Sequence, residues 1–200
     1  MKLPQNQKQL FSNSFLNNKK EERNTELQLS KKELQDWQAK ICSFQESLFL
    51  NQNNYHKQEE LFTEKTSNND SAYNLNPLEL SALSLNFWRL IESPYKGPAL
   101  YFVIDRTSSF TSPILLYIGE TIAAEKRWKG DHDCKSYISA YSEALSLAEI
   151  PFQLSIRFWT AVPKDTKARR KIEQLLIQKW QSPFNKENQK RWKTPFTVDI

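Results

Sequence analysis

Five polar residues in the carboxy-terminal half of the chain have side chains that could act together on a substrate. They are Tyr101, Tyr117, Arg127, Glu173 and Asn185. A guanidinium can fork onto the oxygens of an anion, and a carboxylate can hold a hard cation such as Mg²⁺. A phenol, with a reference pKa of about 10, needs nearby positive charge before it can accept a proton. Their joint chemistry therefore depends on whether the fold brings them together.

Histidine and glycine are scarce, and their scarcity excludes whole classes of enzyme. His56 and His132 are the only histidines, so neither a multi-histidine metal centre nor an HExxH zinc helix can form. With three glycines in the chain, no P-loop or Rossmann glycine pattern is present, and there is no GxSxG motif. The common hydrolase and nucleotide-binding families are therefore excluded.

Each of the five residues also has an ordinary structural interpretation. Strand tyrosines most often pack in a core and hydrogen-bond their hydroxyls. Arg127 could simply pair with Glu125 or Asp131 at the surface, a contact usually worth under about 1 kcal/mol. Glu173 could pair with an arginine one turn earlier on its helix, and Asn185 could shape the turn that follows.

Two apolar runs that contain the tyrosines are typical of paired strands. Residues 99–104 read ALYFVI and residues 114–119 read ILLYIG, with a polar stretch between them, which predicts a hairpin. Beyond it, Thr121 is placed to cap a helix over residues 121–128 that Gly130 would end.

The pattern continues with three more elements. We expect a helix over residues 136–149, a strand over residues 155–162 and a helix over residues 166–180. The last of these places four apolar side chains on one face: Ile172, Leu175, Leu176 and Trp180. The predicted order is strand, strand, helix, helix, strand, helix.

The amino-terminal part has a different composition. Residues 1–30 are rich in Asn, Gln and Lys and have too little apolar surface to order, which predicts a disordered tail. Residues 31–62 form an amphipathic pattern, with apolar residues at Leu34, Trp37, Ile41, Phe44, Leu48 and Phe49. That face could pack on the rest of the chain or dock a protein partner. With a linker over residues 63–76, we expect an extension at 1–76 and a domain at 77–200.

The five polar residues stand in the order found in the GIY-YIG nuclease family, which this chain resembles over roughly residues 97–190. The family's hallmark is two tyrosine-bearing tripeptides on neighbouring strands. Here they read Ala-Leu-Tyr, ending at Tyr101, and Tyr-Ile-Gly, starting at Tyr117. The family's arginine one helix later matches Arg127. Its helical glutamate and the asparagine twelve residues beyond match Glu173 and Asn185.

The resemblance implies a fold and an activity. The fold is α+β, a small central antiparallel three-stranded sheet flanked by helices. The activity is metal-dependent hydrolysis of DNA phosphodiester bonds by an endonuclease. Glu173 would bind Mg²⁺ or Mn²⁺, and Arg127 would bind the phosphate. Tyr117 would be the general base for water, with Tyr101 positioning water or phosphate.

Two departures from the family pattern affect these expectations. The first tripeptide begins with Ala99 instead of glycine, which preserves the strand and its tyrosine. Glu120 directly follows Gly119, where excision-repair relatives carry a lysine. This carboxylate could help to hold the metal or could weaken DNA binding.

Basic residues are concentrated in the carboxy-terminal half. Residues 126–193 hold fifteen Lys or Arg against seven Asp or Glu, whereas residues 1–76 are balanced. A basic segment suits a polyanion binder, although an ordinary solvated face gives the same pattern. The predicted phosphate-tracking surface comprises Lys126, Lys129, His132, Lys135, Arg169, Arg170 and Lys171. Trp128 could stack on a base or pack in the core.

Two function classes remain open. The first is the endonuclease, and the second is a non-catalytic nucleic-acid-binding or scaffold protein that keeps the fold. No run reaches the eighteen or so apolar residues of a membrane helix. Cys42 and Cys134 lie far apart, which suggests reduced thiols and a cytoplasmic protein.

Overall fold

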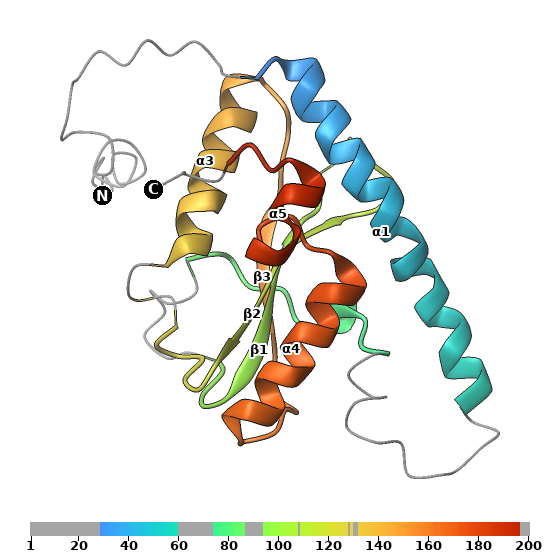
Figure 1. Ribbon diagram of the computed structural model, residues 1–200, viewed down its shortest axis with the longest axis vertical. Coiled ribbons are helices and arrows are strands. Elements are labelled where there is room, and N and C mark those ends of the chain that lie inside the picture. Colours follow the sequence, from blue (N-terminus) through green and yellow to red (C-terminus); the bar gives the residue numbers. More distant parts are fainter. Residues whose placement is uncertain are drawn as a thin grey trace, which may run out of the picture.

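The computed structural model describes residues 29–59, 74–86, 94–107, 109–127, 129 and 132–196 (Figure 1). Its elements are α1 (Lys31–Glu59), the 3₁₀ helix η1 (Pro77–Glu79), β1 (Ala99–Asp105), β2 (Ile114–Thr121), α3 (Asp133–Leu147), β3 (Leu154–Trp159), α4 (Thr166–Trp180) and α5 (Lys186–Trp192). Four sequence expectations fall wholly or mostly outside the described residues. They are the disordered tail, the linker, the place of Trp128 and the helix stop at Gly130.

The three strands form one antiparallel sheet in the order β2-β1-β3. In Figure 1, α1 runs along one side of the molecule and α3 along the other, with the sheet, α4 and α5 between them. The expected α+β fold, a small three-stranded antiparallel sheet flanked by helices, is confirmed.

Side chains of β1 alternate between two cores because successive residues of a strand point to opposite faces. All seven residues of β1 are buried. Tyr101 and Val103 pack in a first core with residues of α1 and α3, whereas Leu100 and Phe102 pack in a second with residues of α4. The central strand is thus fixed from both faces.

Helix α1 is built into this packing. Leu34, Trp37 and Ile41 belong to the first core, so the apolar stripe packs on the rest of the chain. The fully buried Gln45 adds polar contacts. Its Nε2 donates to the carbonyls of Leu115 and Trp180, both at 3.0 Å, and its Oε1 accepts from the Leu115 N–H at 2.8 Å. This part of the stripe is therefore unavailable to a protein partner.

The helix expected over residues 121–128 is wrong. Strand β2 continues to Thr121, which pairs with Ala99, and the residues from Ala124 to Arg127 form turns. Thr121 Oγ1 accepts a hydrogen bond from the Ala123 N–H at 3.1 Å, so the hydroxyl shapes a turn instead of capping a helix.

The other boundaries differ by a few residues. Helix α3 begins earlier than expected, at Asp133, because His132 Nδ1 accepts from the Cys134 N–H and caps it. Strand β3 ends at Trp159 and not at residue 162, since its pairing with β1 ends there. Helix α4 matches the expected range, and α5 was not expected. Within the described residues, no helix has the length and apolar content needed to span a membrane.

Candidate active site

The two tyrosines lie side by side on the central pair of strands. Tyr101 comes from β1 and Tyr117 from β2, and their ring centroids are 5.9 Å apart. Tyr101 pairs across the sheet with Gly119, and its ring lies over that residue. A Cβ added to Gly119 would come within 2.3 Å of Tyr101 Cζ. The glycine of the second tripeptide thus provides the space that the tyrosine of the first one needs.

The Tyr101 hydroxyl is the centre of a hydrogen-bond network. Arg127 Nε donates to it at 3.1 Å, and His132 Nε2 lies 3.0 Å from it. His132 Nδ1 accepts from the Cys134 N–H, and Nε2 contacts both the Tyr101 hydroxyl and Arg127 Nη2, which can only donate. The hydroxyl of Tyr117 also hydrogen-bonds to Tyr101, which accepts. Arg127 and Tyr117 therefore both donate to one phenol oxygen.

Burial dominates the protonation of these groups. It raises the pKa of both tyrosines well above the usual value, and the nearby Arg127 charge only partly opposes this at Tyr101. Burial, followed by the Arg127 charge, lowers the pKa of His132 to about 4. At neutral pH both phenols and the imidazole are accordingly uncharged.

Glu173 is the carboxylate that lies near Tyr117. Both line a pocket of about 180 Å³, which also contains Asn185. The Glu173 carboxylate accepts a hydrogen bond from the Glu120 backbone N–H. Burial, followed by the charge of Glu120, raises the pKa of Glu173 to about 7. Near neutral pH a fraction of the Glu173 side chains is therefore protonated, and a nearby positive charge would favour the ionised form.

Glu173 suits a hard divalent cation. Its donor atoms are oxygens, and the charges of Glu120 and Glu187 act on it. The parts of the chain that the structure describes bring no three His, Cys, Asp or Glu side chains together as a ready metal cage. A site with one carboxylate and water ligands is consequently the form that these residues fit.

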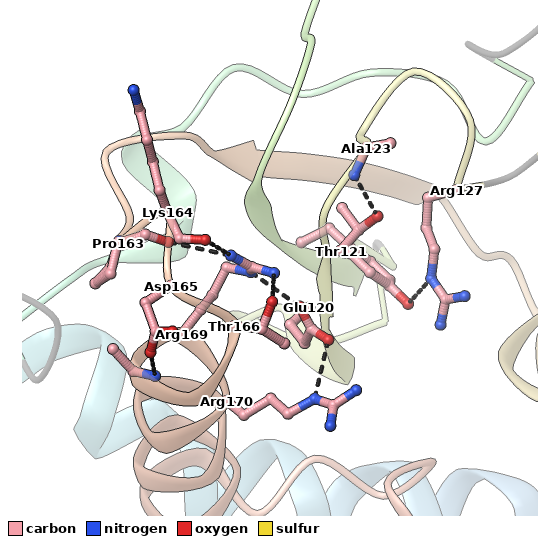
Figure 2. Close-up of polar contacts among 12 residues, drawn as sticks. Glu120, Thr121, Ala123, Arg127, Pro163, Lys164, Asp165, Thr166, Arg169 and Arg170 are labelled. Carbon is pink, nitrogen blue, oxygen red and sulfur yellow. Dashed lines mark hydrogen bonds and ion pairs between the residues drawn. The ribbon is translucent and has the colours of Figure 1, made fainter.

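Glu120 is held by two arginines of α4, as Figure 2 shows. Arg169 Nε donates to it at 2.8 Å and Arg170 Nε at 3.2 Å. Arg169 is 0% exposed and also donates to the carbonyls of Pro163 and Lys164. Both oxygens of Glu120 are thus engaged, and its charge is balanced within the protein.

Arg169 is therefore not at the surface where we expected it. The carboxylate at the end of β2 needs a buried cation, and the first turn of α4 supplies it. Arg170, which is 68% exposed, remains in contact with solvent.

Asn185 also lines this pocket, and its side chain is fixed by hydrogen bonds. Its Oδ1 accepts from the Ile118 N–H at 3.0 Å and its Nδ2 donates to the Ile118 carbonyl at 2.8 Å. Ser182 Oγ also donates to Oδ1. With 4% of its surface exposed, Asn185 clamps the strand residue next to Tyr117.

A comparison with protein-family models assigns part of the chain. Residues 98–188 match the family model of the GIY-YIG catalytic domain. The segment is a GIY-YIG domain. No curated protein and no solved structure matches the chain.

A GIY-YIG domain indicates nuclease activity in general. The structure groups the five expected residues around Tyr117. Tyr101 hydrogen-bonds to Tyr117, and Arg127 hydrogen-bonds to Tyr101. Glu173 and Asn185 line the same pocket as Tyr117.

The predicted basic surface of the GIY-YIG domain is present in part. Lys126, Lys129, Arg170 and Lys171 are exposed, and Lys135 is half-buried. His132, also placed on this surface from the sequence, instead faces the Tyr101 hydroxyl. The sequence feature that could have indicated this contact is the position of His132, five residues after Arg127.

Residues of α5 and the start of α3 at the pocket were missed. Lys186 and Glu187 line the pocket, and Lys186 Nζ lies 3.0 Å from Asp133. They were missed because α5 was not expected. An asparagine at the N-cap position with Glu187 in the first turn is a recognisable helix start.

Proposed function

We propose that the protein is a metal-dependent endonuclease that hydrolyses DNA phosphodiester bonds at this site. The observation that carries the proposal is the position of Tyr117. Its hydroxyl hydrogen-bonds to Tyr101, and its side chain lines the same pocket as Glu173. Tyr117 thus lies in contact with Tyr101 and in the same pocket as Glu173, the carboxylate that suits a metal.

Glu173 would hold a Mg²⁺ or Mn²⁺ ion, which would supply a Lewis acid at the scissile phosphate. The carboxylate's place is set by its hydrogen bond from the Glu120 N–H, just beyond the glycine of the second tripeptide. Burial and neighbouring carboxylates favour its protonated form, so cation binding and loss of that proton are coupled.

Tyr117 would contact the attacking water, because it is the tyrosine that lines the pocket. Tyr101 is fully buried and lies behind it. For Tyr117 to take a proton from the attacking water, its own hydroxyl proton would first leave to solvent through the pocket, a loss that a cation held by Glu173 would favour. Tyr101, neutral and hydrogen-bonded to Arg127 Nε, would then donate its hydroxyl proton in a hydrogen bond to the Tyr117 phenolate and so stabilise it.

Arg127 has a second role in this proposal. Its Nε contacts Tyr101, whereas a guanidinium has five N–H donors in a fork that matches phosphate oxygens. Nη2 contacts His132 Nε2, so the N–H groups of Nη1 would bind a non-bridging oxygen of the phosphate. Asn185 would be a positioning residue, because its amide is consumed by contacts to Ile118 and Ser182.

A panel of supercoiled, linear, single-stranded and branched DNAs tests the proposal. Each is incubated with Mg²⁺, Mn²⁺ or EDTA, using wild type and Tyr117→Phe, which removes only the hydroxyl. We expect metal-dependent cleavage by wild type, little by Tyr117→Phe, and equal DNA binding by both. Salt-sensitive DNA binding without cleavage by wild type would instead support the non-catalytic alternative.

A further inference from the structure

A second pocket lies at the opposite edge of the sheet from Tyr117. The strand order β2-β1-β3 places Tyr117 on one edge strand and this pocket beside the other. The pocket has a volume of about 340 Å³ and contains Arg106, Ser155 and Arg157. Its far wall comes from the segment around Leu83, which forms an isolated antiparallel bridge with Ile156.

Arg157 carries a buried charge without a counter-ion. Its side chain is on β3, and the residue is 5% exposed. Nη1 donates to the carbonyls of Leu78 and Leu80, but Nε is buried and has no acceptor. No carboxylate among the described residues pairs with this guanidinium. Burying a cation without an anionic partner is costly, so an anion here would stabilise the protein.

Arg106 adds a second positive charge to the same pocket. It follows β1, and its backbone N–H donates to the Gln153 carbonyl at 2.9 Å, which holds it beside the pocket. Its side chain is exposed, and its charge, after the larger effect of burial, lowers the pKa of Arg157. Two guanidiniums that repel each other thus lie at one concave site.

Hydroxyl groups complete the set of donors. Ser84 and Ser155 both line the pocket, one from each side of the bridge at Leu83. Guanidinium and hydroxyl donors around a concavity suit a tetrahedral oxyanion, since the guanidinium fork matches two of its oxygens.

We propose that this pocket binds a phosphate group through the guanidinium groups of Arg157 and Arg106. The site is separate from the pocket of Tyr117 and Glu173. Where the phosphate belongs to DNA, the inference rests on the proposed function, and the pocket holds a phosphodiester away from the scissile bond. Where it is free phosphate, the site is a ligand site independent of cleavage.

Nuclear magnetic resonance on the full chain in EDTA tests phosphate binding without turnover. The Arg157 Nε–H signal is followed during titration with sodium phosphate, with sodium chloride at matched ionic strength as a reference. The variant is Arg106→Gln, and the control is Arg191→Gln, whose guanidinium lies over Phe44 of α1. Arg157 itself is kept, because its Nη1 bonds attach residues 78–80 to β3.

We expect a saturable, phosphate-specific shift of this signal in wild type and Arg191→Gln, and its loss in Arg106→Gln. No saturable shift, or an equal one in both variants, would overturn the site. The salt dependence of DNA binding then identifies the source of the phosphate. A slope of log K against log salt that falls by about one in Arg106→Gln indicates a DNA phosphodiester. An unchanged slope together with lost phosphate binding indicates free phosphate. A protein that binds phosphate here but cleaves no DNA would retain this site and lose only the proposed function.

Discussion

The ring of Tyr101 occupies the space above Gly119 that any other residue's Cβ would fill. The added Cβ would lie 2.3 Å from Tyr101 Cζ and 2.4 Å from its hydroxyl oxygen. Strand pairing fixes this contact, because the two residues are direct partners in the register of β1 and β2. The position of the Tyr101 ring therefore requires a glycine at residue 119.

Gly119→Ala should accordingly displace the Tyr101 hydroxyl from Arg127 and His132. Tyr101 is fully buried, so the ring cannot swing into solvent, and overpacking of this kind costs about 1–3 kcal/mol. We expect a lower midpoint of denaturant unfolding and a cleavage rate reduced by roughly 10²-fold or more. Ala99→Gly restores the residue usual in the family at a position without this contact, and its cleavage rate should stay near that of wild type.

The buried ion pair between Glu120 and Arg169 should contribute strongly to stability. Removing the cation in Arg169→Met leaves a largely buried carboxylate, at a cost of about 3–5 kcal/mol. Arg170→Met removes an exposed partner of the same carboxylate and should cost under about 1 kcal/mol. Chemical denaturation measures both. Equal losses in the two variants would contradict the buried-pair assignment.

Glu173 should destabilise the metal-free protein as the pH rises. Its pKa is raised to about 7 from its ordinary value of 4.5, so the folded state favours the protonated form. Stability is then lost as the pH rises from about 4.5 through about 7. In EDTA at pH 8, Glu173→Gln should be more stable than wild type by on the order of 2 kcal/mol. Thermal unfolding at pH 5 and pH 8 checks this, and a difference that does not grow with pH would refute it.

His132 has two contacts that different substitutions can separate. Nδ1 caps α3, and Nε2 faces the Tyr101 hydroxyl. His132→Asn keeps a good N-cap residue but loses the contact to the tyrosine. We expect stability near that of wild type with cleavage slowed by roughly 10–100-fold. His132→Ala should also lose about 1 kcal/mol of stability. Wild-type cleavage by His132→Asn would show that the contact has no role in the reaction.

Much of the fold could be predicted from local patterns. Helix α4 matches its expected range because an apolar face recurs at helical spacing from Ile172 to Trp180. The hairpin was predicted because two β-forming runs flank a polar stretch. The helix expected after β2 failed because Thr121 lies in the sheet and pairs with Ala99, a long-range contact that local propensity does not encode.

The expected site residues lie near one another, and their roles in a reaction stay predictions. The resemblance to the GIY-YIG family placed Tyr117 and Glu173 in one set, and both line one pocket. The burial of Arg169 could not be foreseen, because it depends on the Glu120 carboxylate, 49 residues earlier in the chain. The contact of His132 with the Tyr101 hydroxyl likewise depends on the turns from Ala124 to Arg127, where a helix was expected.

The most direct test of the central claim is the single-turnover rate of DNA cleavage as a function of Mg²⁺ and Mn²⁺ concentration. Wild type is compared with Glu173→Gln and with Glu143→Gln, which removes an exposed carboxylate on α3. We predict that Glu143→Gln cleaves like wild type. Glu173→Gln should bind DNA but show a rate lower by roughly 10³-fold at every metal concentration. Metal-dependent cleavage by Glu173→Gln at the wild-type rate would contradict the assignment of Glu173 as the residue that holds the catalytic metal.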